Sequence, residues 1–299
     1  MMQYTYIDSP AALDRLCLSF SERGVDCVAM DFEEESNLHV YGEHLCLVQL
    51  SDRISFYLVD ALVLCRTEEG KASLKAFLEG PVTKIMFDCS SDSAIARKTL
   101  GIALQNVYDI RLTARALGFD GNLCALTERS LGIKVSEEGD KKKYQRANWM
   151  KRPLPQDQLD YALDDVKYLF ELKESLEKEA AEKLSLSVRR HLETEMKRCA
   201  VPRHKDRPGW EKICNYRALP YAQKVYLRHF FIARDNLARR ANVPATFILD
   251  KRLIVAMAKS GTWEGILEGN ALKYKDAFEN ARLSAEKELS DKKTSYRIR

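Results

Sequence analysis

The chain changes character at residues 198–209, where the sequence RCAVPRHKDRPG is rich in proline and charge and has no helical or strand periodicity. Before this segment, short apolar and β-branched runs alternate with helical patterns, whereas only helical patterns follow it. A chain of 299 residues is also longer than the roughly 100–200 residues of a typical domain. We therefore expect a mixed α/β domain over residues 1–197, a linker over residues 198–209 and an all-α domain over residues 210–290.

Charge follows a similar division. The formal net charge of +4 combines an acidic first part with a basic second part. Residues 197–299 carry 23 Lys and Arg against 11 Asp and Glu, whereas residues 1–196 carry 25 against 33. A basic domain can attract the phosphates of a nucleic acid, an anionic membrane surface or an acidic protein. Composition does not choose among these partners, and a solvated basic surface is the alternative to all of them.

The sequence has none of the usual marks of a membrane or secreted protein. Its longest uninterrupted apolar run, residues 253–258, has six residues, against about 20 needed to span a bilayer. No basic stretch followed by an apolar one, as in a signal peptide, occurs near residue 1. The eight cysteines include no C-x-x-C pair, which is typical of reduced thiols rather than of disulfides or a zinc site. We expect a cytoplasmic, monomeric protein with no membrane partner.

Local patterns predict three neighbouring strands early in the chain, over residues 25–33, 45–50 and 54–59, of which the last two form a hairpin. Ser9 and Pro10 predict the start of a helix that ends at Gly24. The patterns that follow predict a helix at 71–78, a strand at 82–87, and helices at 91–100, 109–118, 123–131, 156–180, 219–240 and 251–259.

The first candidate site is the sequence Asp31-Phe32-Glu33 in the earliest of these strands. Alternate residues of a strand face the same way, so Asp31 and Glu33 project together while Phe32 turns to the core. Two adjacent carboxylates repel each other unless a cation lies between them, and Mg²⁺ and Mn²⁺ prefer oxygen ligands. The alternative is a solvated strand edge, which the two further glutamates that follow would also suit.

The second candidate is Asp92, which follows a predicted strand and lies in the first turn of a predicted helix. A carboxylate in that position is favourable to the helix dipole, so a purely structural role is the alternative. Asp88, at the end of the strand, is the nearby competitor for a functional role.

The third candidate is the pair Tyr161 and Asp165 on the predicted helix at 156–180. Residues four apart share a face of a helix, while the apolar residues of the same helix form a separate buried stripe. Asp164 is the obvious rival of Asp165, but it stands three residues from Tyr161 and is displaced around the helix. An ordinary exposed Tyr–Asp pair is the alternative.

Together these motifs resemble the DEDD exonuclease superfamily, in its tyrosine-bearing subgroup. The surrounding sequences look like the ribonuclease D family over about residues 25–175, in the strings DFEEESNLHVYGEHLCLVQL, KIMFDCSSDSAIARKTLGIALQNVYDIRLTARAL and WMKRPLPQDQLDYALDDVKYL. The resemblance implies an RNase H-like fold, with a mixed sheet flanked by helices. It also implies a two-metal 3′→5′ exonuclease that releases nucleoside 5′-monophosphates.

The resemblance assigns roles to five residues of this chain. It implies that Asp31, Glu33 and Asp165 hold one Mg²⁺ or Mn²⁺, that Asp31 bridges to a second, and that Asp92 contributes to the metal-binding network. It also implies that Tyr161 orients the attacking water. The chemistry is consistent, because a pair of cations lowers the pKa of water and stabilises charge on the attacking and leaving oxygens.

Two departures from the family pattern bear on this assignment. Near the start of the second motif, many relatives carry His or Asn where this chain has Phe87 and Asp88. The acidic Asp88 therefore competes with Asp92, to which we assign the role. The family's bacterial members carry two C-terminal helical domains, whereas this chain has room for one. Because of this difference, the resemblance implies the exonuclease reaction but does not extend to the full tRNA-processing specificity.

The segment 141–152, with the sequence KKKYQRANWMKR, is a candidate nucleic-acid surface because it holds six cationic and no acidic side chains. Basic residues follow phosphates, and aromatic faces can stack on bases. Our candidates are Lys151 and Arg152 for phosphates and Trp149 for a base. The alternative is a solvated loop with a buried tryptophan.

In the second part of the chain, residues 210–263 resemble the HRDC helical domain that follows the nuclease in ribonuclease D. Arg228, Arg239 and Arg240 are its candidate nucleic-acid contacts.

We therefore expect a metal-dependent 3′→5′ exoribonuclease that acts on RNA 3′ ends such as those of tRNA precursors. A DNA 3′→5′ exonuclease is the second hypothesis, because the 2′-OH contacts that distinguish the two substrates are not visible in the sequence. A non-catalytic nucleic-acid-binding scaffold is the third. Loss of a carboxylate or of the tyrosine would mark a scaffold, and all five residues are present.

Overall fold

The computed structural model describes residues 3–135, 143–201 and 207–297. The chain forms two compact units, one of residues 1–36 and 43–203 and one of residues 37–42 and 204–299. Part of the predicted linker, residues 202–206, and two residues of the basic segment, Lys141 and Lys142, lie outside the described residues.

The first unit is built on a six-stranded mixed sheet with the order β1-β4-β3-β2-β5-β6. The strands are β1 (Tyr4–Ile7), β2 (Cys27–Ser36), β3 (Glu43–Ser51), β4 (Phe56–Val59), β5 (Thr83–Met86) and β6 (Val107–Asp109). The central strand β3 is antiparallel to both of its neighbours, whereas the outer pairs β1–β4, β2–β5 and β5–β6 are parallel. β2 and β3 are the longest strands. Most of their residues are buried, as expected for strands covered on both faces.

One face of the sheet is covered by α1 (Pro10–Glu22), α3 (Glu68–Leu78) and α4 (Ser90–Leu100), with the one-turn helix α2 (Ala61–Leu64) leading into α3. Their apolar stripes, including Leu13, Leu74 and Ile95, pack in one core with Val28 and Met30 of β2. α1 begins with proline at its first turn, where the missing N–H costs no hydrogen bond.

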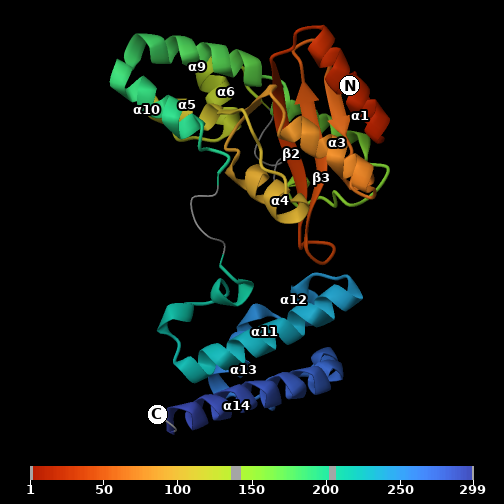
Figure 1. The fold of residues 1–299 in the computed structure, drawn as a ribbon, viewed down its shortest axis with the longest axis vertical. Coiled ribbons are helices and arrows are strands. Elements are labelled where there is room, and N and C mark those ends of the chain that lie inside the picture. Colours follow the sequence, from red (N-terminus) through yellow and green to blue (C-terminus); the bar gives the residue numbers. More distant parts are fainter. Residues whose placement is uncertain (1–2, 136–142, 202–206, 298–299) are drawn as a thin grey trace. The chain divides into compact units, whose positions relative to one another are not determined.

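The other face is covered by α5 (Ile110–Ala116), α6 (Leu123–Leu131), α8 (Gln156–Val166) and α9 (Leu169–Lys183). A last helix of this unit, α10 (Leu186–Met196), has no fully buried residue. Figure 1 shows α5, α6, α9 and α10 grouped on one side of the sheet and α1 and α3 on the other.

The second unit is helical apart from residues 37–42. It contains two short 3₁₀ turns (Gly209–Glu211 and Tyr216–Ala218), α11 (Tyr221–Ala241), α12 (Ala245–Ile248), α13 (Lys251–Ser260), a 3₁₀ segment (Gly269–Tyr274) and α14 (Lys275–Arg297). α13 and α14 both pack on α11, around a core that includes Phe230, Met257 and Phe278. Among the described residues, no helix is both long enough and apolar enough to cross a membrane.

The mixed α/β architecture of the first unit agrees with the prediction, and its differences are local. The short strands β1 and β6 were not predicted, because three or four residues give too little alternation to recognise. The predicted helix at 156–180 is two helices, α8 and α9, separated at Lys167 and Tyr168. α10 was also not predicted.

Candidate active site

Strand β2 places Asp31 and Glu33 on one face of the sheet, as its alternation predicts. Val28, Met30 and Phe32 pack in the core on the opposite face. Asp31 lies opposite Gln49 of β3, and a bulge in the pairing follows directly after Glu33. The bulge interrupts the regular pairing of β2 with β3 directly after the two carboxylates.

Helix α8 supplies Tyr161 and Asp165. The helix packs against β2 and β3 through a buried stripe that includes Leu159, Leu163 and Val166. Because Tyr161 and Asp165 are four residues apart, they share a face next to that stripe. The rival Asp164 lies 4.0 Å from Lys167, with its side chain 43% exposed.

The structure brings Asp31, Glu33 and Asp165 together, with one carboxylate oxygen from each within 4.8 Å of the others. Burial raises the pKa of Glu33 well above its ordinary value, and the charges of Asp31, Asp165 and Asp92 add to this effect. Such a group of like charges is costly unless protons or a cation neutralise it. The donors are all carboxylate oxygens, so the residues fit a hard divalent cation such as Mg²⁺ or Mn²⁺.

Asp92 lies in the first turn of α4, as expected. Burial raises its pKa to about 7, and the negative charges of Glu34, Asp109 and Asp88 also contribute. Asp88 is engaged differently, because its carboxylate forms an ion pair with Arg111. The two acidic residues of the second motif therefore differ: Asp88 has a cation from the protein, whereas Asp92 is electrostatically linked to the acidic group.

Tyr161 is held by aromatic neighbours. Its ring stacks on that of Tyr144 with centroids 4.8 Å apart, and the Trp149 ring lies 6.4 Å away. Burial raises the pKa of Tyr161 far above its ordinary value, helped by the charges of Asp165, Glu33 and Asp31. The phenol therefore stays protonated at neutral pH, and as a hydrogen-bond donor it already interacts with the Asp165 carboxylate.

Trp149 lacks the exposed ring that its predicted role in stacking on a base requires. It is 1% exposed, and its indole N–H donates to the carbonyl oxygen of Tyr144 at 3.2 Å. Both faces of the ring are enclosed by protein, so in this structure Trp149 supports Tyr161 and cannot stack on a base. The large apolar area of tryptophan makes such burial favourable.

Arg152 and Lys151 have different surroundings. The Arg152 guanidinium donates to Asp60 at 2.8 Å and to the Cys46 carbonyl at 2.9 Å, and Asp60 is only 1% exposed. Arg152 is therefore occupied by a buried ion pair that anchors the segment before α8, whereas the side chain of Lys151 is exposed. Only Lys151 retains the accessibility that the prediction requires.

The three candidate arginines of the second unit lie on α11. Arg228 forms an ion pair with Glu288, and Arg239 lies 3.5 Å from Asp235. Arg240 is exposed, and its Nε donates to the Asn236 carbonyl at 3.4 Å within the same helix. All three keep a partly or fully exposed side chain.

Gln49 was not predicted as part of the site. It is fully buried, lies opposite Asp31 in the sheet, and its Nε2 is 3.4 Å from a carboxylate oxygen of Glu33. Among the described residues, its Oε1 has no hydrogen-bond partner. The signal that could have revealed it is an amide inside the apolar run at 45–50.

Comparison with known proteins agrees with this geometry. The sequence profile of a family described as 3′-5′ exonuclease matches residues 4–181, more than half of the chain. Ribonuclease D from Xanthomonas oryzae pv. oryzae is 28% identical over 226 residues, which cover 73% of this chain and 59% of the relative. The exosome complex exonuclease RRP6 from Saccharomyces cerevisiae is 26% identical over 247 residues, which cover 77% of this chain and 32% of the relative.

The crystal structure of Escherichia coli RNase D, described as an exoribonuclease involved in structured RNA processing, has a TM-score of 0.69 at 24% identity. The match covers 94% of this chain and 76% of that chain, and it shows a common fold. This chain spans less than two thirds of the length of the two curated relatives. The profile match extends over the strand and the two helices that carry the acidic residues and Tyr161, and the chain therefore belongs to the 3′-5′ exonuclease family.

Proposed function

We propose that this protein is a metal-dependent 3′→5′ exoribonuclease, which hydrolyses the terminal phosphodiester bond of RNA and releases nucleoside 5′-monophosphates. The observation that carries the proposal is the approach of Asp31, Glu33 and Asp165 to within 4.8 Å of one another. The resemblance to ribonuclease D and RRP6 supports RNA as the substrate.

The acidic group is the proposed site of two Mg²⁺ or Mn²⁺ ions. In this assignment Asp31, Glu33 and Asp165 would hold one cation, Asp31 would also contribute to holding the second, and Asp92 would complete the set. The raised pKa of Glu33 supports the assignment, because a cation would relieve the repulsion that causes it. When bound, the cations lower the pKa of water and neutralise charge on the attacking and leaving oxygens.

Tyr161 is the proposed positioning group for the attacking water. Its phenol stays protonated beside three carboxylates, so it can donate a hydrogen bond but cannot act as a base near neutral pH. Tyr144 and Trp149 limit the freedom of its ring. The packed ring holds the hydroxyl in one place, and such fixed donors contribute to catalysis without reorganising during the reaction.

We propose that residues 210–290 form an HRDC-like domain that helps to bind RNA. Its helices α11, α13 and α14 pack around one core, and the part of the chain from residue 197 onward is basic. Arg239 and Arg240 are exposed and Arg228 is partly exposed, while Arg228 and Arg239 have acidic partners on the protein. Structured RNA 3′ ends of the tRNA-precursor type are the proposed substrates, since the Escherichia coli neighbour is described as acting in structured RNA processing.

Product analysis on a 5′-labelled single-stranded RNA and its DNA counterpart, with Mg²⁺, Mn²⁺ or EDTA, tests the proposal. We expect a ladder that shortens from the 3′ end of the RNA, disappears in EDTA and leaves nucleoside 5′-monophosphates. Degradation of the DNA alone would make the protein a DNA exonuclease. Intact strands with every metal, together with measurable binding, would make it a scaffold.

A further inference from the structure

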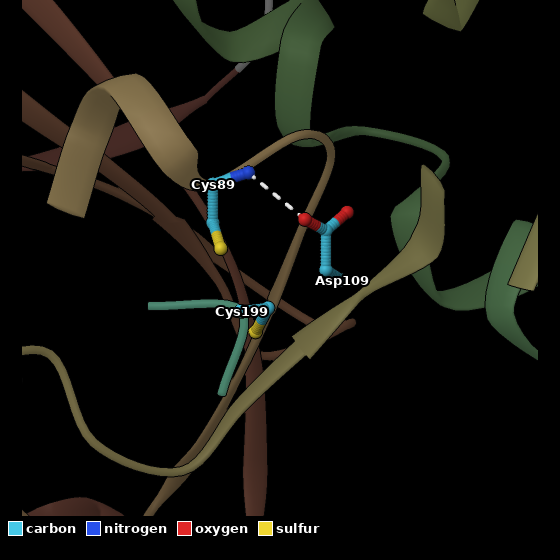
Figure 2. Close-up of side chains that lie close together, drawn as sticks. All are labelled: Cys89, Asp109 and Cys199. Carbon is cyan, nitrogen blue, oxygen red and sulfur yellow. Dashed lines mark hydrogen bonds between the residues drawn. The ribbon is translucent and has the colours of Figure 1, made fainter. Parts of the chain in front are cut away.

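A second group of reactive side chains lies where three separate segments meet. Cys89 precedes the first residue of α4, Asp109 ends β6, and Cys199 follows α10. The two sulfur atoms and one carboxylate oxygen lie within 4.8 Å of one another. Figure 2 shows the side chain of Cys89 directed toward Cys199, with Asp109 beside both. The proposed reaction at the acidic site uses neither cysteine.

Asp109 has a structural role that accounts for its place in the group. Its carboxylate accepts hydrogen bonds from the backbone N–H groups of Asp88 at 2.9 Å, Cys89 at 3.1 Å and Arg111 at 3.0 Å. The side chain is 4% exposed. These bonds fix the backbone of the turn that carries Cys89.

The two thiols are unequal in access and in acidity. Cys89 is fully buried, whereas Cys199 is half-buried. The pKa of Cys199 is lowered by a hydrogen bond from the Cys89 thiol, and the same bond and burial raise the pKa of Cys89. A reagent from solution therefore meets Cys199 first, and Cys89 lies behind it within reach of its sulfur atom.

We propose that Cys89 and Cys199 form a redox-responsive dithiol, which a low-molecular-weight disulfide such as glutathione disulfide oxidises to an intramolecular disulfide. The Cys199 thiolate attacks one sulfur of glutathione disulfide, which forms a mixed disulfide and releases one glutathione thiolate. Cys89 then loses its proton to solvent and attacks the Cys199 sulfur, which releases the second glutathione. The protein loses two electrons and two protons, and glutathione disulfide is reduced to two glutathione molecules.

The bond would connect two places that matter for the rest of the molecule. Cys89 lies three residues before Asp92, at the turn that starts α4. Cys199 belongs to the last turns of the first unit before residues 204–299. In the reduced structure, the contacts of this segment include Arg97 to the Ala200 carbonyl at 3.4 Å and the Cys199 sulfur to the Val107 carbonyl at 3.9 Å. Oxidation would hold this segment covalently to the second motif.

The test is mass spectrometry of the full-length protein after equilibration in glutathione buffers of increasing disulfide content, with acid quenching and alkylation of the remaining thiols. We expect a peptide pair linked through Cys89 and Cys199 to replace the two alkylated peptides in the oxidising buffers. Cys199→Ser removes the linked pair. Cys124→Ser, which replaces another half-buried cysteine of the first unit, leaves it unchanged. This readout does not require nuclease activity.

Two further results decide the order of the steps and the nature of the site. In Cys89→Ala, we expect Cys199 to accumulate as a stable mixed disulfide with glutathione. If that variant does not fold, hydrogen exchange of residues 197–201 in the wild type replaces it, and we expect slower exchange after oxidation. Full alkylation of both cysteines in the most oxidising buffer would overturn the proposal. So would one equivalent of Zn²⁺ that protects both thiols and is lost in Cys199→Ser, because the group would then be a metal site.

Discussion

Two buried acidic sites in the first unit, one at Asp60 and one around Glu33, have opposite electrostatic surroundings. Asp60 is 1% exposed and accepts hydrogen bonds from Arg152 at 2.8 Å and from the Tyr6 hydroxyl at 2.6 Å. Burial alone would raise the pKa of Asp60, but the bonds from Arg152 and Tyr6 lower it overall. Glu33 is 9% exposed, faces Asp31 and Asp165, and has a raised pKa.

This difference separates a group that stabilises the fold from a group prepared for a ligand. A buried charge with an internal partner is costly to disrupt, because removal of the partner leaves the charge buried and unpaired. A buried group of like charges costs stability, and that cost is relieved only when protons or cations arrive. Mutations in the two places are therefore expected to affect different properties, one mainly stability and the other mainly activity.

The largest expected effect is on activity. Asp165→Asn removes a carboxylate from the acidic group but keeps its shape, and we expect the rate of RNA cleavage to fall at least about a thousandfold, roughly 4 kcal/mol of transition-state stabilisation. Stability without metal should be equal or higher, because one of the charges next to Glu33 is gone. Single-turnover cleavage of labelled RNA and urea unfolding in EDTA measure the two effects.

Asp164→Asn is the matched control for this variant. Its carboxylate is 43% exposed and 4.0 Å from Lys167, so we expect cleavage within about twofold of wild type. Equal losses of cleavage rate in the two variants would show that the substitutions act by disturbing the helix and not by removing the Asp165 carboxylate.

The second prediction concerns the internal ion pair. Arg152→Ala leaves the Asp60 charge buried without its cation, and we expect the free energy of unfolding to fall by about 3 kcal/mol. Urea unfolding measures the change. Lys151→Ala, next to it and exposed, should leave stability within about 0.5 kcal/mol of wild type while weakening RNA binding. If the two variants lost stability equally, Arg152 would not have the role that its contacts indicate.

Tyr161→Phe is expected to have an intermediate effect. It removes the hydroxyl but keeps the ring that stacks on Tyr144, so cleavage should slow about a hundredfold with little change in stability. Tyr144→Phe keeps a ring in the same stack and loses a bond to the exposed Asp157, so its rate should stay near that of wild type. A rate of Tyr161→Phe equal to wild type would exclude a positioning role for the hydroxyl.

The sequence could predict the acidic group better than its surroundings, for a physical reason. Asp31 and Glu33 share a strand face, and Tyr161 and Asp165 share a helix face, because local periodicity determines side-chain direction. The position of Arg152 depends on Asp60, which is 92 residues away, and local patterns do not record such a contact. Lys151 and Arg152 were thus predicted together, although only one of them is exposed.

Trp149 and Gln49 show the same limit. A tryptophan within a basic segment suits either stacking on a base or burial, and only the packing of the Trp149 ring near Tyr161 distinguishes them. Gln49 lies in an apolar strand, and its amide can be assigned to the site only from the strand register, which places it opposite Asp31. β6, with three residues, was too short to predict, although Asp109 at its end holds the turn before Asp92.

The last expected effect is a pH dependence of stability that has opposite signs in the two groups. Asp92, with a pKa of about 7, and Glu33 bind protons in the folded state that the unfolded chain does not bind until lower pH. Without metal, stability should therefore rise as pH falls from 8 to 5, by at most about 1.4 kcal/mol per pH unit for each group. Asp60 has a lowered pKa, so its contribution is present above the ordinary value of 3.8 and is lost below it.

Urea unfolding in EDTA across this pH range measures the effect, and Asp92→Asn isolates it, because the variant should show a smaller rise than wild type. Asp88→Asn is the control: it removes only one of the lesser contributions to the raised pKa of Asp92, so its pH profile should lie much closer to that of wild type than the profile of Asp92→Asn. Protons and Mg²⁺ compete for the same carboxylates, so stabilisation by Mg²⁺ should grow between pH 6 and pH 8. Metal stabilisation that did not change with pH would mean that the cation binds away from the groups with raised pKa values. The acidic group would then differ from Asp60 only in how its buried charge is compensated, and not in being a metal site.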